Sequence, residues 1–134
     1  MYTTNFKLSG GTFGAVFDLP IATASITTPQ IGLNAGGAGL TDLYIQPFTL
    51  GYHFARVDFL VAYGFMAPTG RYTRNPNSSD NIGSGYWGND ITGNATVYLT
   101  KNKATTANLA TVWEIHGQKD GTNITPGQAF TMEW

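Results

Sequence analysis

Few residues of this chain could do acid–base or metal chemistry, and most of them fall on stretches with the pattern of β-strands. Glu114 and His116 are two residues apart, as are Arg56 and Asp58, so each pair shares one face of its strand. We expect Glu133, on the last such stretch, to have the same facing as Glu114. These side chains could form an acid–base or metal cluster inside a barrel. The alternative, which we favour, is a structural network lining a polar lumen, in which Arg56 is neutralised by carboxylates because an enclosed charge needs a partner.

Other catalytic or metal sites find no support in the sequence. The two histidines, His53 and His116, fall at opposite ends of their strands, so we do not expect a two-histidine metal site within one subunit. Ser78, Ser79 and Ser84 lie in a long polar stretch without the Gly-x-Ser-x-Gly elbow of hydrolases. The chain has no cysteine, which excludes disulfides and thiolate metal sites. We therefore predict a protein that is not an enzyme, with no metal and no cofactor.

Three aromatic residues, Tyr72, Tyr86 and Trp87, lie where a strand is expected to meet a long loop. They are candidates for an interfacial girdle or for a surface on which an aromatic ligand stacks. The simpler alternative is that they attach the loop to the rim of a barrel. Salt bridges could order the same rim through three charged residues: Asp42, Arg71 and Asp90.

The elements that must position these residues are strands. Between Val57 and Phe65 every odd position is large and apolar, and every even position except Leu60 is small or charged, which is the period of a strand with two different faces. Similar patterns occur at 2–8, 13–21 with a weak continuation over 22–27, 42–52, 93–100, 105–116 and 128–134. Helical periodicity is almost absent. We predict an all-β fold, with residues 1–134 forming one domain of about seven antiparallel strands in a meander, closed into a β-barrel or part of one.

The predicted connections alternate between short and long. The short ones are 9–12, 53–55 and 101–103, and the long ones are 29–40, 68–88 and 117–127. Outer-membrane barrels have this asymmetry, with short turns at one end and long loops at the other.

Charge is scarce, at 11% of residues against roughly 25% in typical soluble domains. The charges on predicted strands all fall on the less apolar face: Lys7, Asp18, Arg56, Asp58, Glu114 and Glu133. The rest of that face is mostly Gly, Ala, Thr and Asn, whereas the outside of a soluble barrel should be dense in Lys and Glu. In a membrane barrel the apolar face contacts lipid and the polar face lines the lumen. The net charge of −1 gives no indication of a nucleic-acid partner.

Two interpretations follow from the residues. In the first, a membrane barrel has its lumen lined by Arg56, Asp58, Glu114, His116 and Glu133, with lipid or detergent outside Phe59, Val61, Leu109 and Trp113. In the second, a small soluble β-barrel is a binding module whose apolar faces turn inward around a core or a small hydrophobic ligand. We expect the second form to be a homo-oligomer, because its sheet edges need covering.

Four segments occur together in one order: GLTDLYIQP at 39–47, YGFMAPTGRY at 63–72, NIGSGYW at 81–87 and TVWEIHGQKDGTNITPG at 111–127. This set resembles the family of meta-pathway phenol-degradation proteins, which are regarded as outer-membrane transporters of bacteria. The resemblance covers residues 39–134, and 1–38 fit more loosely. It implies an outer-membrane β-barrel that passes small hydrophobic or aromatic compounds and does no catalysis.

The chain departs from that family in two ways. Its first residues, MYTTNFKLSGG, lack the charged and apolar regions of a signal peptide, so the localisation of this chain stays open. About seven strands are also fewer and less even than the eight or more of single-chain bacterial barrels. We therefore expect a fragment of a longer barrel.

Overall fold

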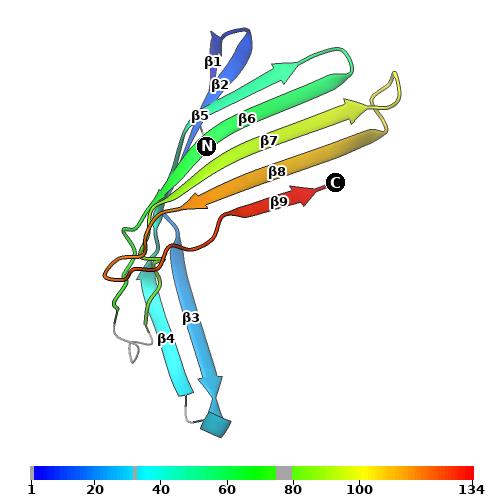
Figure 1. Ribbon diagram of the computed structural model, residues 1–134. Coiled ribbons are helices and arrows are strands. Elements are labelled where there is room, and N and C mark those ends of the chain that lie inside the picture. The colour runs from blue at the N-terminus through cyan, green and yellow to red at the C-terminus, as the bar shows by residue number, and fades with distance from the viewer. Residues whose placement is uncertain (1, 32, 75–79) are drawn as a thin grey trace.

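The computed structural model describes residues 2–31, 33–74 and 80–134, and within them the chain is built of strands and one short 3-10 turn (Figure 1). Seven strands form one sheet in the order β1-β2-β5-β6-β7-β8-β9, and β3 and β4 form a separate hairpin. Every pairing is antiparallel. The predicted all-β antiparallel meander is confirmed. The sheet is open, with β1 and β9 at its edges, which is compatible with part of a barrel.

The strands have the following bounds: β1 Tyr2–Leu8, β2 Gly11–Asp18, β3 Ile21–Thr28, β4 Leu33–Leu40, β5 Leu43–His53, β6 Val57–Ala67, β7 Gly88–Tyr98, β8 Thr106–His116 and β9 Ala129–Glu133. The four central strands β5 to β8 have 11 residues each. That is the length of a strand that crosses a bilayer at a tilt, about 9–11 residues.

The prediction of a long irregular connection over 29–40 is wrong. A 3-10 turn, Pro29–Ile31, leads into β4, which pairs with β3 along its whole length, from Ile21↔Leu40 to Thr28↔Leu33. The pattern failed here because β4 is rich in Gly and Ala, which have low intrinsic β-propensity and leave no large apolar side chains to count. The predicted total of about seven strands was too low, because it did not count the two strands of this hairpin. The described residues contain nine strands.

The predicted strand over 13–21 is also divided. β2 ends at Asp18, and β3 begins at Ile21, after Pro20. Proline cannot donate to the ladder, but its carbonyl oxygen still accepts a hydrogen bond from the amide of Thr41, at 3.0 Å. The β3–β4 hairpin therefore continues the β2–β5 pair beyond a break, and in Figure 1 it projects away from the main sheet.

The connections after β6 and β8 are long and those at the other end of the sheet are short, as predicted, whereas the third predicted long connection, 29–40, contains β4. The turn between β1 and β2 is formed by Ser9 and Gly10, both with positive φ (51° and 84°), as in the tight turns that suit the twist of a hairpin. Figure 1 shows the loops that follow β6 and β8 at the same end of the sheet as the root of the β3–β4 hairpin. This end is called the loop end below, and the other the turn end.

The two faces of the sheet differ in chemistry. Along one row across five strands the register aligns Leu50, Val61, Gly93, Thr111 and Met132, and the next row aligns Thr49, Ala62, Thr92, Val112 and Thr131 on the opposite face. The first belongs to the apolar face, whose large members are Phe13, Phe17, Ile45, Phe48, Leu50, Tyr52, Val57, Phe59, Val61, Tyr63, Phe65, Ile91, Val97, Leu109, Trp113, Ile115, Phe130 and Met132. The second belongs to the polar face.

The apolar face is not covered by any other described element. Phe59 and Val61 are each 46% exposed, and Trp113 is 43% exposed. Among the described residues the only buried hydrophobic side chains are Leu50, Ala62 and Ala67. The described sheet therefore has almost no internal core, and the large side chains of its apolar face are only partly covered.

Candidate functional site

The polar face carries the ionisable side chains of the sheet. At the paired positions that the structure describes, the apolar face has no charged residue, and the polar face has Lys7, Asp18, His53, Asp58, Asp90, Glu114, His116 and Glu133. One row shows the continuity of this face: Lys7, Thr12, Gly51, Leu60, Asn94, Ala110 and Glu133 align across all seven strands. A surface with isolated charges among small polar residues is typical of the lumen of a membrane barrel.

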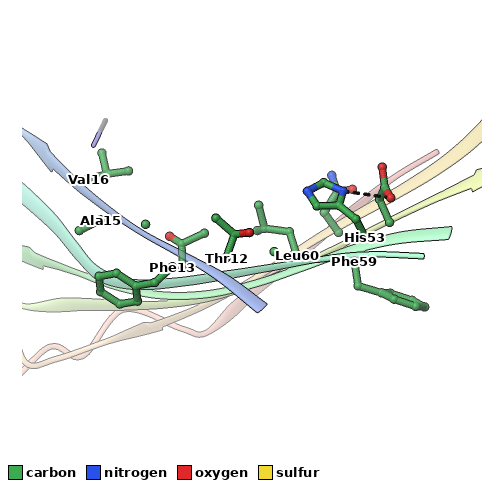
Figure 2. A pocket seen from close by; sticks show the side chains of 12 residues that line it. Thr12, Phe13, Ala15, Val16, His53, Phe59 and Leu60 are labelled. Atoms are coloured by element: carbon green, nitrogen blue, oxygen red, sulfur yellow. Dashed lines mark ion pairs between the residues drawn. The ribbon is translucent and has the colours of Figure 1, made fainter. Parts of the chain in front are cut away.

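Near the turn end, Asp58 is the centre of a compact polar cluster. Its carboxylate accepts a hydrogen bond from the hydroxyl of Tyr98 at 2.5 Å and lies 3.1 Å from Nδ1 of His53 (Figure 2). The Nζ of Lys103 lies 4.3 Å from the centre of the Tyr98 ring, a cation–π contact. Asp58 was predicted as a lumen residue. Its partners were not predicted, and they come from β5 and β7, on either side of its own strand.

Arg56 is not part of this cluster. It lies in the turn before β6 and is exposed, so it does not share a strand face with Asp58. Within the described ranges, the close contacts between basic and acidic side chains are His53–Asp58 and Arg71–Asp80. The predicted network in which carboxylates neutralise Arg56 is therefore wrong. The period-2 pattern was extended one residue too far, because β6 begins at Val57.

A second polar cluster lies near the loop end. Asp90 and Glu114 are direct neighbours on β7 and β8, and His116 lies two residues farther along β8 on the same face. The Nδ1 of His116 is 2.7 Å from the carbonyl oxygen of Gly127, and its ring meets that of Tyr86 edge-on at 5.0 Å. Two carboxylates placed opposite each other repel, so this arrangement does not stabilise the sheet.

Glu133 does not join Glu114 and His116. It is the register partner of Ala110, four residues along β8 from Glu114, a separation of roughly 13 Å at the rise of a strand. The sheet therefore places these three residues on one face but does not gather them into one site. In the part of the chain that the structure describes, no group of three His, Cys, Asp or Glu side chains is arranged to hold a metal ion.

The three rim aromatics have separate environments. The ring of Tyr72 lies 4.8 Å from the Nζ of Lys119, within the loops. Tyr86 contacts His116. Trp87 is 55% exposed and contacts Phe65, a residue of the apolar face, with 6.2 Å between ring centres. The three residues therefore do not form one common surface, either as a girdle or as a platform for a stacked ligand.

The loop after β6 is held by a feature that the sequence pattern did not reveal. Asp42 is buried, with 7% of its surface exposed. One carboxylate oxygen accepts the amide of Gly70 at 2.9 Å, and the other accepts the amide and the hydroxyl of Ser84 at 2.7 and 2.6 Å. We call this contact the Asp42 clasp, since it joins the two halves of the loop to the start of β5.

The predicted salt bridges among Asp42, Arg71 and Asp90 are wrong. Arg71 pairs with Asp80 at 3.1 Å, and its guanidinium also donates to the carbonyl of Ala38 in β4 at 3.4 Å. Asp42 binds backbone amides and Ser84 instead, and Asp90 lies on the sheet. Ser84 was considered only as a nucleophile, whereas its hydroxyl donates to Asp42. Ser78 and Ser79 lie outside the described residues.

Sequence reasoning also missed Tyr44 and Tyr98 on the polar face. The hydroxyl of Tyr44 donates to Gln46 at 3.2 Å, and its ring covers Gly64, where an added Cβ would lie 2.2 Å from that hydroxyl. The register partner of Tyr44 is Met66, so its ring reaches Gly64 diagonally, two residues along β6, and no local sequence pattern indicates this contact. No helix among the described residues is long and apolar enough to cross a membrane, a result that concerns helices alone.

Comparison with known families identifies a family model that matches this chain. The family model Phenol_MetA_deg, described as "Putative MetA-pathway of phenol degradation", matches residues 1–134. The match covers the whole chain, including 1–38, where the quoted segments gave only a loose fit. No curated protein and no solved structure matches the chain.

Proposed function

The chain belongs to the Phenol_MetA_deg family, whose name links it to a pathway of phenol degradation, and from this premise we propose that it forms wall strands of an outer-membrane β-barrel. In this proposal the barrel does no catalysis and passes small hydrophobic or aromatic compounds. The apolar face contacts lipid, and the polar face lines the passage.

The observation that carries the proposal is the composition of the apolar face. It has no charge at the paired positions described, yet Phe59, Val61 and Tyr63 are 41–46% exposed. In water, an exposed apolar surface of this extent would associate or aggregate. In a bilayer the same surface would contact hydrocarbon instead of water, and the strands between the edges β1 and β9 have both neighbours paired, as a spanning sheet requires.

Aromatic residues near both ends of the apolar face support the same orientation. Trp87 lies at the loop end, just before β7 begins at Gly88, and is exposed. Phe54 and Phe59 lie at the turn end, with 6.1 Å between their ring centres. Aromatic girdles flank the apolar band of outer-membrane barrels at the two interfaces.

The soluble alternative requires the apolar face to enclose a core. In the described chain no other element covers this face, and two buried small residues, Ala62 and Gly64, lie on the polar face. The geometry thus favours the membrane proposal over a soluble binding module.

The direct test of function is uptake of an aromatic compound by vesicles with lipopolysaccharide in the outer leaflet, a barrier that slows hydrophobic solutes. We expect folded protein reconstituted in these vesicles to raise the initial rate of 1-naphthol uptake several-fold over empty vesicles. Protein added after unfolding in urea is the matched control. Insertion without faster uptake would contradict passage, and failure to insert would contradict the membrane location.

A further inference from the structure

A hollow of about 390 Å³ lies on the polar face, between β2, β5, β6 and β7. Its floor is formed where Thr12 and Leu60 flank Gly51, which has no side chain to fill the space between them. A Cβ added at Gly51 would have only one neighbour within 4 Å, the carbonyl oxygen of Thr12 at 4.0 Å. The hollow therefore exists because this position is a glycine.

Two register shifts lie beside the hollow. The pairing of β2 with β5 shifts between Gly14 and Val16, and that of β5 with β6 shifts between Ile45 and Phe48. Such bulges bend strands and increase their twist, so they curve a sheet locally. Among the residues that line the hollow, Figure 2 shows Val16, Thr12, Leu60 and His53 on one side of the sheet and the ring of Phe59 on the other.

The lining combines an apolar floor with a polar wall. Val16, Leu60 and Gly51 provide apolar or empty surface, and the side chains of His53, Asp58 and Asn94 provide hydrogen-bonding groups. A cavity of roughly 150 Å³ holds a benzene molecule, so the hollow has room for one ring with small substituents. A pocket that is mostly apolar, with a few polar groups that fix orientation, is the usual form of a small-molecule site.

The histidine determines which polar substituent fits. Because Nδ1 of His53 faces the Asp58 carboxylate at 3.1 Å, the proton of a neutral imidazole resides on Nδ1 and leaves Nε2 as an acceptor. In Figure 2 this second ring nitrogen is directed toward Leu60 and Thr12, across the hollow. An acceptor there suits a ligand hydroxyl that donates a hydrogen bond. A ligand carboxylate could not donate to it and would meet the negative charge of Asp58.

We propose that this hollow binds a neutral, one-ring hydroxy-aromatic compound, with the ring on Val16, Leu60 and Gly51 and the hydroxyl donating to Nε2 of His53. The inference rests on the proposed function, because it places a selective site on the wall of the passage. It adds that selection is by charge and by the hydroxyl. Neutral phenols are bound, and aromatic carboxylates are rejected.

The test is an NMR titration of methyl-labelled protein in detergent micelles with phenol, toluene and benzoate. We expect phenol to shift the Val16 and Leu60 methyl signals saturably, and benzoate to leave them unchanged. The Val61 and Leu109 methyls on the apolar face report phenol that has merely dissolved in the micelle. Shifts at Leu60 that do not saturate and only parallel those of Val61 would overturn the proposal.

Two variants make the test specific. Gly51→Val fills the hollow and should weaken phenol binding at least tenfold, whereas Ala129→Val adds similar bulk on the same face outside the hollow and should change nothing. His53→Ala removes one hydrogen bond and should weaken phenol about tenfold but leave toluene unaffected. Equal phenol affinity in Gly51→Val and Ala129→Val, or equal losses of phenol and toluene in His53→Ala, would overturn the site.

The two proposals can fail separately. If 1-naphthol uptake is absent but Leu60 shifts saturably with phenol, the hollow binds its ligand and the passage is disproved. If uptake is present and Leu60 does not respond saturably, the passage stands and the hollow is disproved.

Discussion

Replacing Val61 by arginine should lower the free energy of unfolding in lipid vesicles by about 2–4 kcal/mol, the cost of a basic side chain at the middle of a lipid-facing strand. Val61 is at the centre of β6, lies on the apolar face beside Leu50 and Gly93, and is 46% exposed. A guanidinium at this position would lie in hydrocarbon if the proposed orientation is right. The measurement is urea unfolding in vesicles, followed by tryptophan fluorescence.

The matched control is Thr92→Arg. Thr92 lies one row away, on the polar face between Ala62 and Val112, so the same side chain would point into the aqueous passage. We expect a change within about 0.5 kcal/mol, as for a surface substitution. The opposite order, with Thr92→Arg costly and Val61→Arg harmless, would mean that the apolar face meets water.

Removing the Asp42 carboxylate should release the loop after β6. Asp42→Ala leaves the amides of Gly70 and Ser84 and the hydroxyl of Ser84 without their acceptor. Hydrogen bonds to a charged group contribute about 1.5–3 kcal/mol each, so the loop should open more easily by about 3 kcal/mol or more. The measurement is amide hydrogen exchange, in which the protection of Gly70 and Ser84 should fall at least about 100-fold.

Ser84→Ala is the control for the clasp. It removes the hydroxyl but keeps both amide hydrogen bonds, so protection at Gly70 should fall by a smaller factor than in Asp42→Ala. Close backbone contacts also surround the loop and could hold it in place independently of the clasp. A Cβ on Gly83 would lie 2.6 Å from the backbone of Gly70, and one on Gly37 would lie 2.8 Å from the carbonyl oxygen of Asp80. Unchanged exchange in Asp42→Ala would show that these close contacts hold the loop without the carboxylate.

The fold class and the two-faced character of the sheet could be predicted because apolar residues recur at every second position along the strands. From Val57 to Phe65 the alternation is clear, and the register of β6 with β5 and β7 preserves it. The loop asymmetry was also visible, since Gly, Asn, Ser and Pro concentrate between the strands. Only the β3 half of the β3–β4 hairpin could be predicted from the sequence, because the Gly and Ala residues of β4 give no contrast between an apolar and a polar face.

The sites could be predicted only in part, because a strand pattern fixes the face of a residue but not its row. It placed Glu114 and Glu133 on one face, but they lie four positions apart along β8. It began β7 at 93, whereas pairing with β6 extends the strand back to Gly88 and brings Asp90 next to Glu114. The partnership of Asp42 with Ser84 spans 42 residues, and no local pattern indicates it.

The orientation of the sheet is the central claim, and a nitroxide scan of β6 tests it most directly. The chain has no cysteine, so single cysteines can be introduced and spin-labelled one at a time from Val57 to Ala67 without background. In vesicles, collision with oxygen reports lipid and collision with a water-soluble nickel chelate reports water. We predict a period-2 alternation, with labels at 59, 61 and 63 exposed to oxygen and labels at 58, 60 and 62 exposed to the chelate. The reverse phase, or odd positions shielded from both reagents as in a dry core, would contradict the account.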